Sequence, residues 1–216
     1  MTVAICGIGV TGGVSTAIGK AILLAGDELH IEPAVVPANA VEAEVTRFRQ
    51  AVATAVQQLH DLRHQIPQST PRDILEFVDA HLLMLEDKAI SEAPVTSIRE
   101  EGCSAEWALQ MRRNQLVKVF DEMEDPYLRT RKDDVDHVVN RIQNILLGRS
   151  EVRLLKLESH IVVARDLTPA DIILLHNQRV RGLITEFGSP MSHTAILARS
   201  LRIPTIMGAH NVTRHI

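Results

Sequence analysis

The spacing of apolar residues divides the chain into a strand-like beginning, a long helical middle and a strand-rich end. In residues 33–148 apolar positions recur at intervals of three and four, as on one side of a helix. Residues 1–32 and 149–216 instead hold short apolar or β-branched runs separated by Gly and Pro, which is typical of strands. We therefore expect one discontinuous α/β domain, 1–32 and 149–216, that carries an inserted antiparallel all-α domain, 33–148.

The helical middle is predicted to contain five helices. The first starts at a capping-box-like pair, Asn39 and Glu42, and stops before Pro67. Its apolar seam consists of Val41, Val45, Phe48, Val52, Ala55, Leu59, Leu62 and Ile66. The other helices are expected over residues 70–85, 88–101 with an irregularity at Pro94, 104–124 and 126–147.

The strand-rich end contains the best candidate for chemistry. A strand-like run, 180–187, is followed by turn residues and then by a short apolar-faced helix that reaches Leu201. Ser192 suits the N-cap, which places His193 in the first helical turn. Backbone N–H groups and the helix dipole favour a negatively charged group there, so an imidazole at this point could accept a phosphoryl group. Further strands are expected at 152–157 and 161–164.

Composition bounds the possible partners. The chain has 216 residues, of which 45% are hydrophobic and 23% charged, as in a soluble globular protein. A net charge of −4 and only 3% aromatic residues argue against nucleic acid or an anionic membrane as partner. No apolar run reaches the roughly 20 residues of a membrane span, and no signal peptide is evident. Cys6 and Cys103 fit buried thiols in a reducing compartment, so we expect a cytoplasmic protein.

Two other patterns are weak. Residues 7–12 superficially match a dinucleotide-binding glycine pattern, but no helix with a suitably placed acidic residue follows, so a loop between strands is the better interpretation. His60 and His64 are four residues apart on the first helix, yet Asp61 faces another way. We therefore predict no metal site in the chain.

The segment around His193 resembles a known signature. Residues 188–199, together with the later run 203–208, resemble the phosphohistidine signature of phosphoenolpyruvate-utilising enzymes. This resemblance implies an α/β phosphohistidine (swivelling) domain in which His193 carries the phosphoryl group. It also implies that Ser192 and Thr194 supply hydroxyls to the catalytic site, although simple helix capping explains them equally well. Ser189 and Met191 depart from the family pattern.

The helical middle resembles one branch of these enzymes, enzyme I of the bacterial phosphotransferase system, at residues 79–87 and 122–131. In that family this region binds the small histidine phosphocarrier HPr. Apolar residues in 79–87 also outnumber what one helix face needs, which by itself favours a protein-docking surface. The resemblance implies partner contacts at His81, Leu83, Met84, Asp87 and Arg131. Ala89 stands where the family often has an acid.

The resemblance further implies that the phosphoryl group originates from phosphoenolpyruvate and passes through His193 to a histidine of HPr. Phosphoenolpyruvate and Mg²⁺ would be bound by a C-terminal domain of the full-length enzyme, which also forms the homodimer. We expect this chain to be a C-terminally truncated part that holds no cofactor and cannot use phosphoenolpyruvate alone. The alternatives are a phosphohistidine domain of a phosphoenolpyruvate synthase or pyruvate phosphate dikinase, and a non-catalytic helical docking module.

Overall fold

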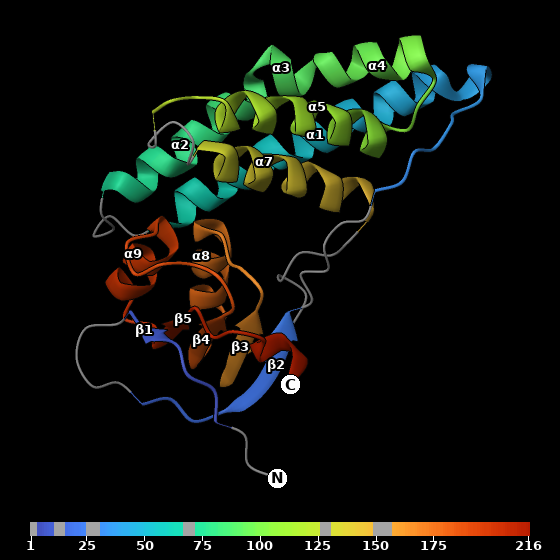
Figure 1. Cartoon of the computed structure of the whole chain (residues 1–216). Coiled ribbons are helices and arrows are strands. Elements are labelled where there is room, and N and C mark those ends of the chain that lie inside the picture. Colours follow the sequence, from blue (N-terminus) through green and yellow to red (C-terminus); the bar gives the residue numbers. More distant parts are fainter. Residues whose placement is uncertain (1–3, 11–15, 25–30, 67–71, 126–130, 149–156) are drawn as a thin grey trace. The chain divides into compact units, whose positions relative to one another are not determined.

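The computed structural model describes residues 4–10, 16–24, 31–66, 72–125, 131–148 and 157–216 (Figure 1). These residues form two compact units, an α/β unit (1–27, 62–78 and 152–216) and a helical unit (28–61 and 79–151). An α/β part and a helical part are therefore both present, as expected. Residues 62–78, which the sequence pattern groups with the helices, belong by their contacts to the α/β unit. One such contact joins Asn177 Nδ2 to Gln65 Oε1 at 3.0 Å.

The α/β unit contains a mixed five-stranded sheet with strands from both ends of the chain (Figure 1). Its order is β1-β5-β4-β3-β2. The strands are β1 (Ile8–Gly9), β2 (Lys20–Leu24), β3 (His160–Ala164), β4 (Gly182–Thr185) and β5 (Thr205–Met207). β2, β3, β4 and β5 pair in parallel, and β1 runs antiparallel to β5. The strand expected at 152–157 falls almost entirely outside the described residues.

Two helices connect the parallel strands. Helix α8 (Pro169–Asn177) links β3 to β4, and α9 (His193–Ser200) links β4 to β5, as parallel strands require. The start of α8 is fixed by a capping box in which the Thr168 hydroxyl and the Asp171 carboxylate bind each other's backbone N–H. The buried apolar side chains of this unit include Val162, Val163, Ile172, Ile173, Leu175, Leu183, Ala195 and Leu197.

Among the described residues, six further helices also bury apolar side chains. They are α1 (Val41–Gln65), α2 (Arg72–Glu86), α3 (Lys88–Ser91), α4 (Ala93–Glu101), α5 (Ala105–Asp121) and α7 (Arg131–Leu146). The expected α1 seam is buried at Val45, Phe48, Ala55, Leu59 and Leu62. One expectation was wrong: Asn39 lies inside a short 3-10 turn, η1 (Ala38–Ala40), while Glu42 binds Arg99. The irregularity expected near Pro94 is present, since the helical segment 88–101 is broken at Glu92, just before a proline that cannot donate a backbone hydrogen bond.

A partly buried network of ion pairs joins α1 to α5. The guanidinium of Arg47 donates to both carboxylate oxygens of Glu44 and of Glu106, at 2.7–3.0 Å. Glu44 also accepts a hydrogen bond from the backbone N–H of Ala105. The hydrogen bond from Arg47 is the main reason why the pKa of Glu44 lies below its ordinary value, although partial burial opposes it. This network therefore stabilises the helical unit while Glu44 is ionised.

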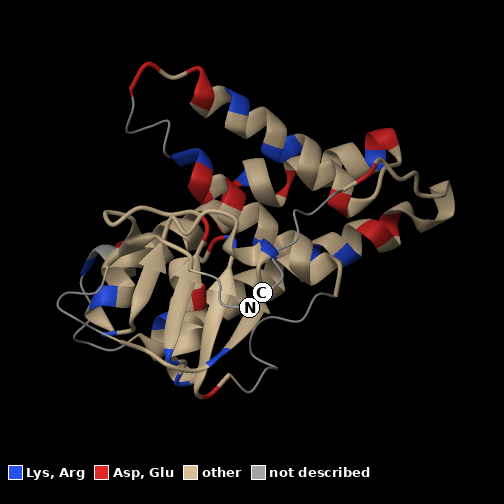
Figure 2. Ribbon diagram, turned by 60° about the horizontal axis from the view of Figure 1, so that its bottom comes forward, with Lys and Arg blue, Asp and Glu red and all other residues tan. Residues whose placement is uncertain are grey.

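Charge is distributed unevenly between the two units. The helical unit holds 20 of the 27 acidic residues and 12 of the 23 Lys and Arg residues, a formal charge of 12 − 20 = −8. Figure 2 shows the acidic residues gathered on the helices. An acidic surface of this kind favours a partner with basic side chains. Among the described helices, none is both long and apolar enough to cross a membrane.

Candidate active site and docking surface

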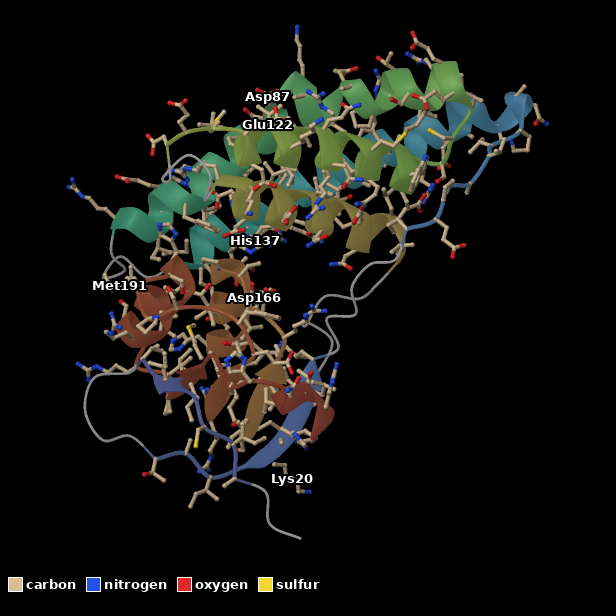
Figure 3. All side chains as sticks on the ribbon, viewed as in Figure 1. Lys20, Asp87, Glu122, His137, Asp166 and Met191 are labelled. Carbon is tan, nitrogen blue, oxygen red and sulfur yellow. The ribbon has the colours of Figure 1, made fainter. Side chains whose placement is uncertain are left out.

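His193 is the first residue of α9, at the carboxyl end of strand β4, and its side chain is exposed. The residue is reached through a turn, 186–192, in which Met191 is 83% exposed (Figure 3). Ligands of parallel α/β sheets bind at the carboxyl ends of the strands. The exposed imidazole therefore lies where a bound group or a partner protein can reach it.

The two hydroxyls that flank His193 hold the backbone around it. Ser192 caps α9: its Oγ accepts from the Ala195 N–H at 3.2 Å and donates to the Ser189 carbonyl at 2.9 Å. Thr194 is only 8% exposed, and its hydroxyl donates to the Leu167 carbonyl at 2.8 Å. Since Leu167 follows strand β3, this bond ties the first turn of α9 to the neighbouring strand end. Both hydroxyls thus act on the position of His193.

The turn before α9 depends on one glycine. Gly188 has φ +105°, a conformation that residues with a Cβ rarely adopt, and an added Cβ would lie 3.1 Å from Met207 Sδ. At the other end of α9, Arg199 donates to the Val10 carbonyl at 2.8 Å and to the Pro190 carbonyl at 3.3 Å. Arg199 therefore ties the turn and the residue after β1 to the helix.

An aromatic ring beside His193 was not found from the sequence. The ring of Phe77 lies 5.3 Å from that of His193, centroid to centroid, with a tilt of 39°. Phe77 is 7% exposed. Phe77 falls within the helix expected over residues 70–85, and a helical pattern does not distinguish a residue that packs on an imidazole from any other core residue. The contact restricts the orientation of the candidate nucleophile.

The five expected docking residues fall into two groups. Leu83 is 68% exposed and Met84 is half-buried, both on α2. Asp87, directly after α2, is exposed (Figure 3). His81 is instead buried, at 4% exposure, and Arg131 is half-buried. The structure therefore offers only the first group on the surface of the helical unit.

Asp134 connects the two residues of the second group, His81 and Arg131. Its Oδ1 lies 3.5 Å from His81 Nε2, and its Oδ2 accepts from Arg131 at 2.8 Å. Burial is the main reason why the pKa of His81 lies below its ordinary value, although the nearby Asp134 carboxylate opposes it. Burial alone would raise the pKa of Asp134, but the neighbouring His81 and Arg131 outweigh burial and lower that pKa.

Two protein families match most of the chain. The family description "PEP-utilising enzyme, N-terminal" matches residues 6–131, and "PEP-utilising enzyme, mobile domain" matches residues 156–216. The chain belongs to the PEP-utilising enzymes. His193 lies within the segment matched to the mobile domain, and the helical unit lies largely within the N-terminal match.

Individual members of the PEP-utilising enzymes point to one branch. The chain is 38% identical to the phosphoenolpyruvate-protein phosphotransferase of Cupriavidus necator over its full length. It is 32% identical to the protein of the same name from Haemophilus influenzae over 95% of its length. The chain spans only 38% and 36% of those two proteins.

Two solved structures of enzyme I proteins also resemble the chain. A solution structure of enzyme I (nEIt) matches 99% of this chain and 86% of that one, with a TM-score of 0.78 and 32% identity. The N-terminal domain of a nitrogen enzyme I matches 98% of this chain and 86% of that one, with a TM-score of 0.73. At 22% identity the second match supports the fold alone. The resemblance to enzyme I is therefore confirmed, and the two alternatives are not favoured.

Proposed function

We propose that this chain is the phosphohistidine and HPr-binding part of enzyme I, a phosphoenolpyruvate-protein phosphotransferase. His193 is its phosphoryl carrier. The observation that carries the proposal is the position of His193: an exposed imidazole on the first turn of α9, inside the segment matched to the mobile domain. The proteins to which the chain is similar carry the name of that activity.

The reaction comprises two transfers. A neutral ring nitrogen of His193 attacks the phosphorus of phosphoenolpyruvate, an N–P bond forms and the P–O bond to the enol breaks. The enolate leaves, takes a proton and becomes pyruvate. A histidine nitrogen of HPr then attacks the same phosphorus, which breaks the N–P bond and returns His193 to its neutral form. The first-turn N–H groups and the dipole of α9 favour the charge of the phosphoryl group.

The neighbouring residues position the nucleophile. Ser192 and Thr194 fix the first turn of α9 through the hydrogen bonds described above, and Phe77 limits rotation of the ring. We therefore assign the hydroxyls of Ser192 and Thr194 the role of positioning the His193 ring. Mg²⁺ supplies charge neutralisation for phosphoenolpyruvate when it is bound. The chain spans only 38% and 36% of the two phosphotransferases compared above, and we assign Mg²⁺ and phosphoenolpyruvate to the remainder of the full-length homodimer.

The docking surface for HPr lies on the helical unit. Leu83, Met84 and Asp87 provide direct contacts: an exposed leucine, a half-buried methionine and an exposed acidic side chain. His81 and Arg131 act through Asp134, which holds α7 against α2 beneath this surface. The acidic balance of the helical unit favours a partner with a basic contact face.

We assign the phosphohistidine domain to residues 1–32 and 149–216 and the HPr-binding domain to residues 33–148, by chain continuity. We also propose that the protein acts in the cytoplasm and binds neither nucleic acid nor membrane. The full-length enzyme, and not this part alone, uses phosphoenolpyruvate.

The test is intact-mass spectrometry of the chain after incubation with phosphorylated HPr. We expect an acid-labile gain of one phosphoryl group in the wild type and none in His193→Gln. His176→Gln is the matched control, since His176 is an exposed histidine of the same unit at the end of α8, and it should be phosphorylated like the wild type. Phosphorylation of His193→Gln, or none of the wild type despite detectable HPr binding, would contradict the proposal.

A further inference from the structure

Helices α2 and α7 bring two imidazoles and one carboxylate together inside the helical unit, away from the proposed phosphoryl carrier in sequence. The residues are His81 on α2 and Asp134 and His137 on α7. One ligand atom of each residue lies within 4.8 Å of the others. The two rings are 6.0 Å apart, centroid to centroid. His81 and Asp134 are 4% and 9% exposed, and His137 is half-buried. Figure 3 labels His137 on α7.

We propose that His81, Asp134 and His137 form a binding site for a divalent transition-metal ion, with Zn²⁺ as its best-suited occupant. Two imidazole nitrogens and one carboxylate oxygen are a common protein ligand set for zinc, and water completes the four-coordinate shell. The proposal does not depend on phosphoryl transfer by His193.

The distances suit this ion. Zinc binds nitrogen and carboxylate oxygen at about 2.0–2.2 Å, so two ligands of one tetrahedral ion are about 3.4 Å apart. His81 Nε2 and Asp134 Oδ1 are already 3.5 Å apart. The longest separation in the cluster, at most 4.8 Å, must shorten by about 1.4 Å to reach that geometry. Since His81 and Asp134 are already at the required spacing, the change falls on His137, which is half-buried.

The helix geometry brings the ligands to one side. Asp134 and His137 are three residues apart on α7 and therefore lie on the same face. Carboxylate-x-x-His pairs on one helix, completed from a facing helix, are a recurrent metal-binding arrangement in helical bundles. The sequence argument against a metal site considered only pairs within one helix, so it could not find this cluster.

The surroundings have opposing effects on a cation. Arg131 donates to Asp134 Oδ2, which orients the carboxylate and leaves Oδ1 directed at His81. The charges of Arg131 and Arg141 nevertheless act on this cluster and disfavour a second cation. The formal charge of −8 on the helical unit offsets part of that repulsion. A bound ion would cross-link α2 to α7 beneath Leu83 and Met84.

The experiment is calorimetric titration of the 216-residue chain with Zn²⁺, with three histidine or aspartate variants. We expect one equivalent of Zn²⁺ to bind the wild type, and His137→Gln to weaken binding at least tenfold. The matched control is His64→Gln, which removes an exposed histidine from the His60/His64 pair on α1. This control should bind Zn²⁺ like the wild type.

Loss of binding in His64→Gln with retention in His137→Gln would overturn the proposal, as would the absence of any saturable Zn²⁺ binding by the wild type. Circular dichroism without metal checks that His137→Gln remains folded. If that variant unfolds, Asp134→Asn replaces it, and the readout is the rise in Tm on adding Zn²⁺. The wild type should show this rise and Asp134→Asn should not; an equal rise in both would contradict the site.

Discussion

The hydroxyl of Thr194 provides a sharp test of how the structure positions His193. Thr194→Val keeps the shape of the side chain but removes the hydrogen bond to the Leu167 carbonyl, which is 2.8 Å long and buried. A buried carbonyl left without its donor costs about 1–3 kcal/mol. For a unit of this size each kcal/mol lowers Tm by about 4–8 °C, so we expect a fall of about 4 °C or more by scanning calorimetry.

Thr54→Val is the matched control. The Thr54 hydroxyl also donates to a backbone carbonyl at 2.8 Å, that of Gln50, but this bond is exposed to water. We therefore expect a change within about 0.5 kcal/mol. The positioning role of Thr194 also predicts that Thr194→Val, below its Tm, still accepts a phosphoryl group from phosphorylated HPr, more slowly than the wild type. Unchanged stability with abolished transfer would refute this reasoning and make Thr194 a direct catalytic group.

Three further predictions follow from the described contacts. The pKa of Glu44 is lower in the folded than in the unfolded state, so the stabilisation by its ionised carboxylate is complete above the unfolded pKa, about 4.3. This stabilisation is lost as the pH falls through the folded pKa. In urea unfolding measured from pH 7 to 3, Glu44→Gln should therefore lose less unfolding free energy than the wild type as the pH falls. Gly188→Ala should destabilise the α/β unit by about 1–3 kcal/mol and slow phosphorylation, whereas Gly9→Ala, whose Cβ would meet nothing within 4 Å, should be near neutral. Leu83→Glu should weaken HPr binding about tenfold or more in calorimetry, whereas Leu147→Glu, also at an exposed leucine, should not; equal effects would contradict the assigned surface.

The repeating patterns were sufficient to predict much of the fold. The three-and-four spacing from Val45 to Leu62 predicts α1 because a helix must bury one continuous stripe. The capping box of Thr168 and Asp171 at the start of α8 is likewise an interaction between residues close in sequence. The position of His193 at the start of α9 followed from the same local signals.

Contacts between distant residues were not predictable in this way. Phe77 packs on His193 although more than 100 residues separate them, and a helical pattern specifies which face is apolar but not what that face touches. His81 was expected on the surface of the docking region, yet it is buried against Asp134. The pattern could not show this because the partner carboxylate belongs to another helix. The docking roles themselves remain predictions.

Reversible transfer through His193 can be followed in a single turnover. The phosphorylated chain is purified, mixed with unphosphorylated HPr, and both proteins are followed by intact-mass spectrometry. We expect one phosphoryl group to leave the chain as one appears on HPr, and peptide mapping of the starting material to place it on His193. A phosphoryl group on another residue, or one on His193 that HPr cannot remove, would rule out His193 as the carrier.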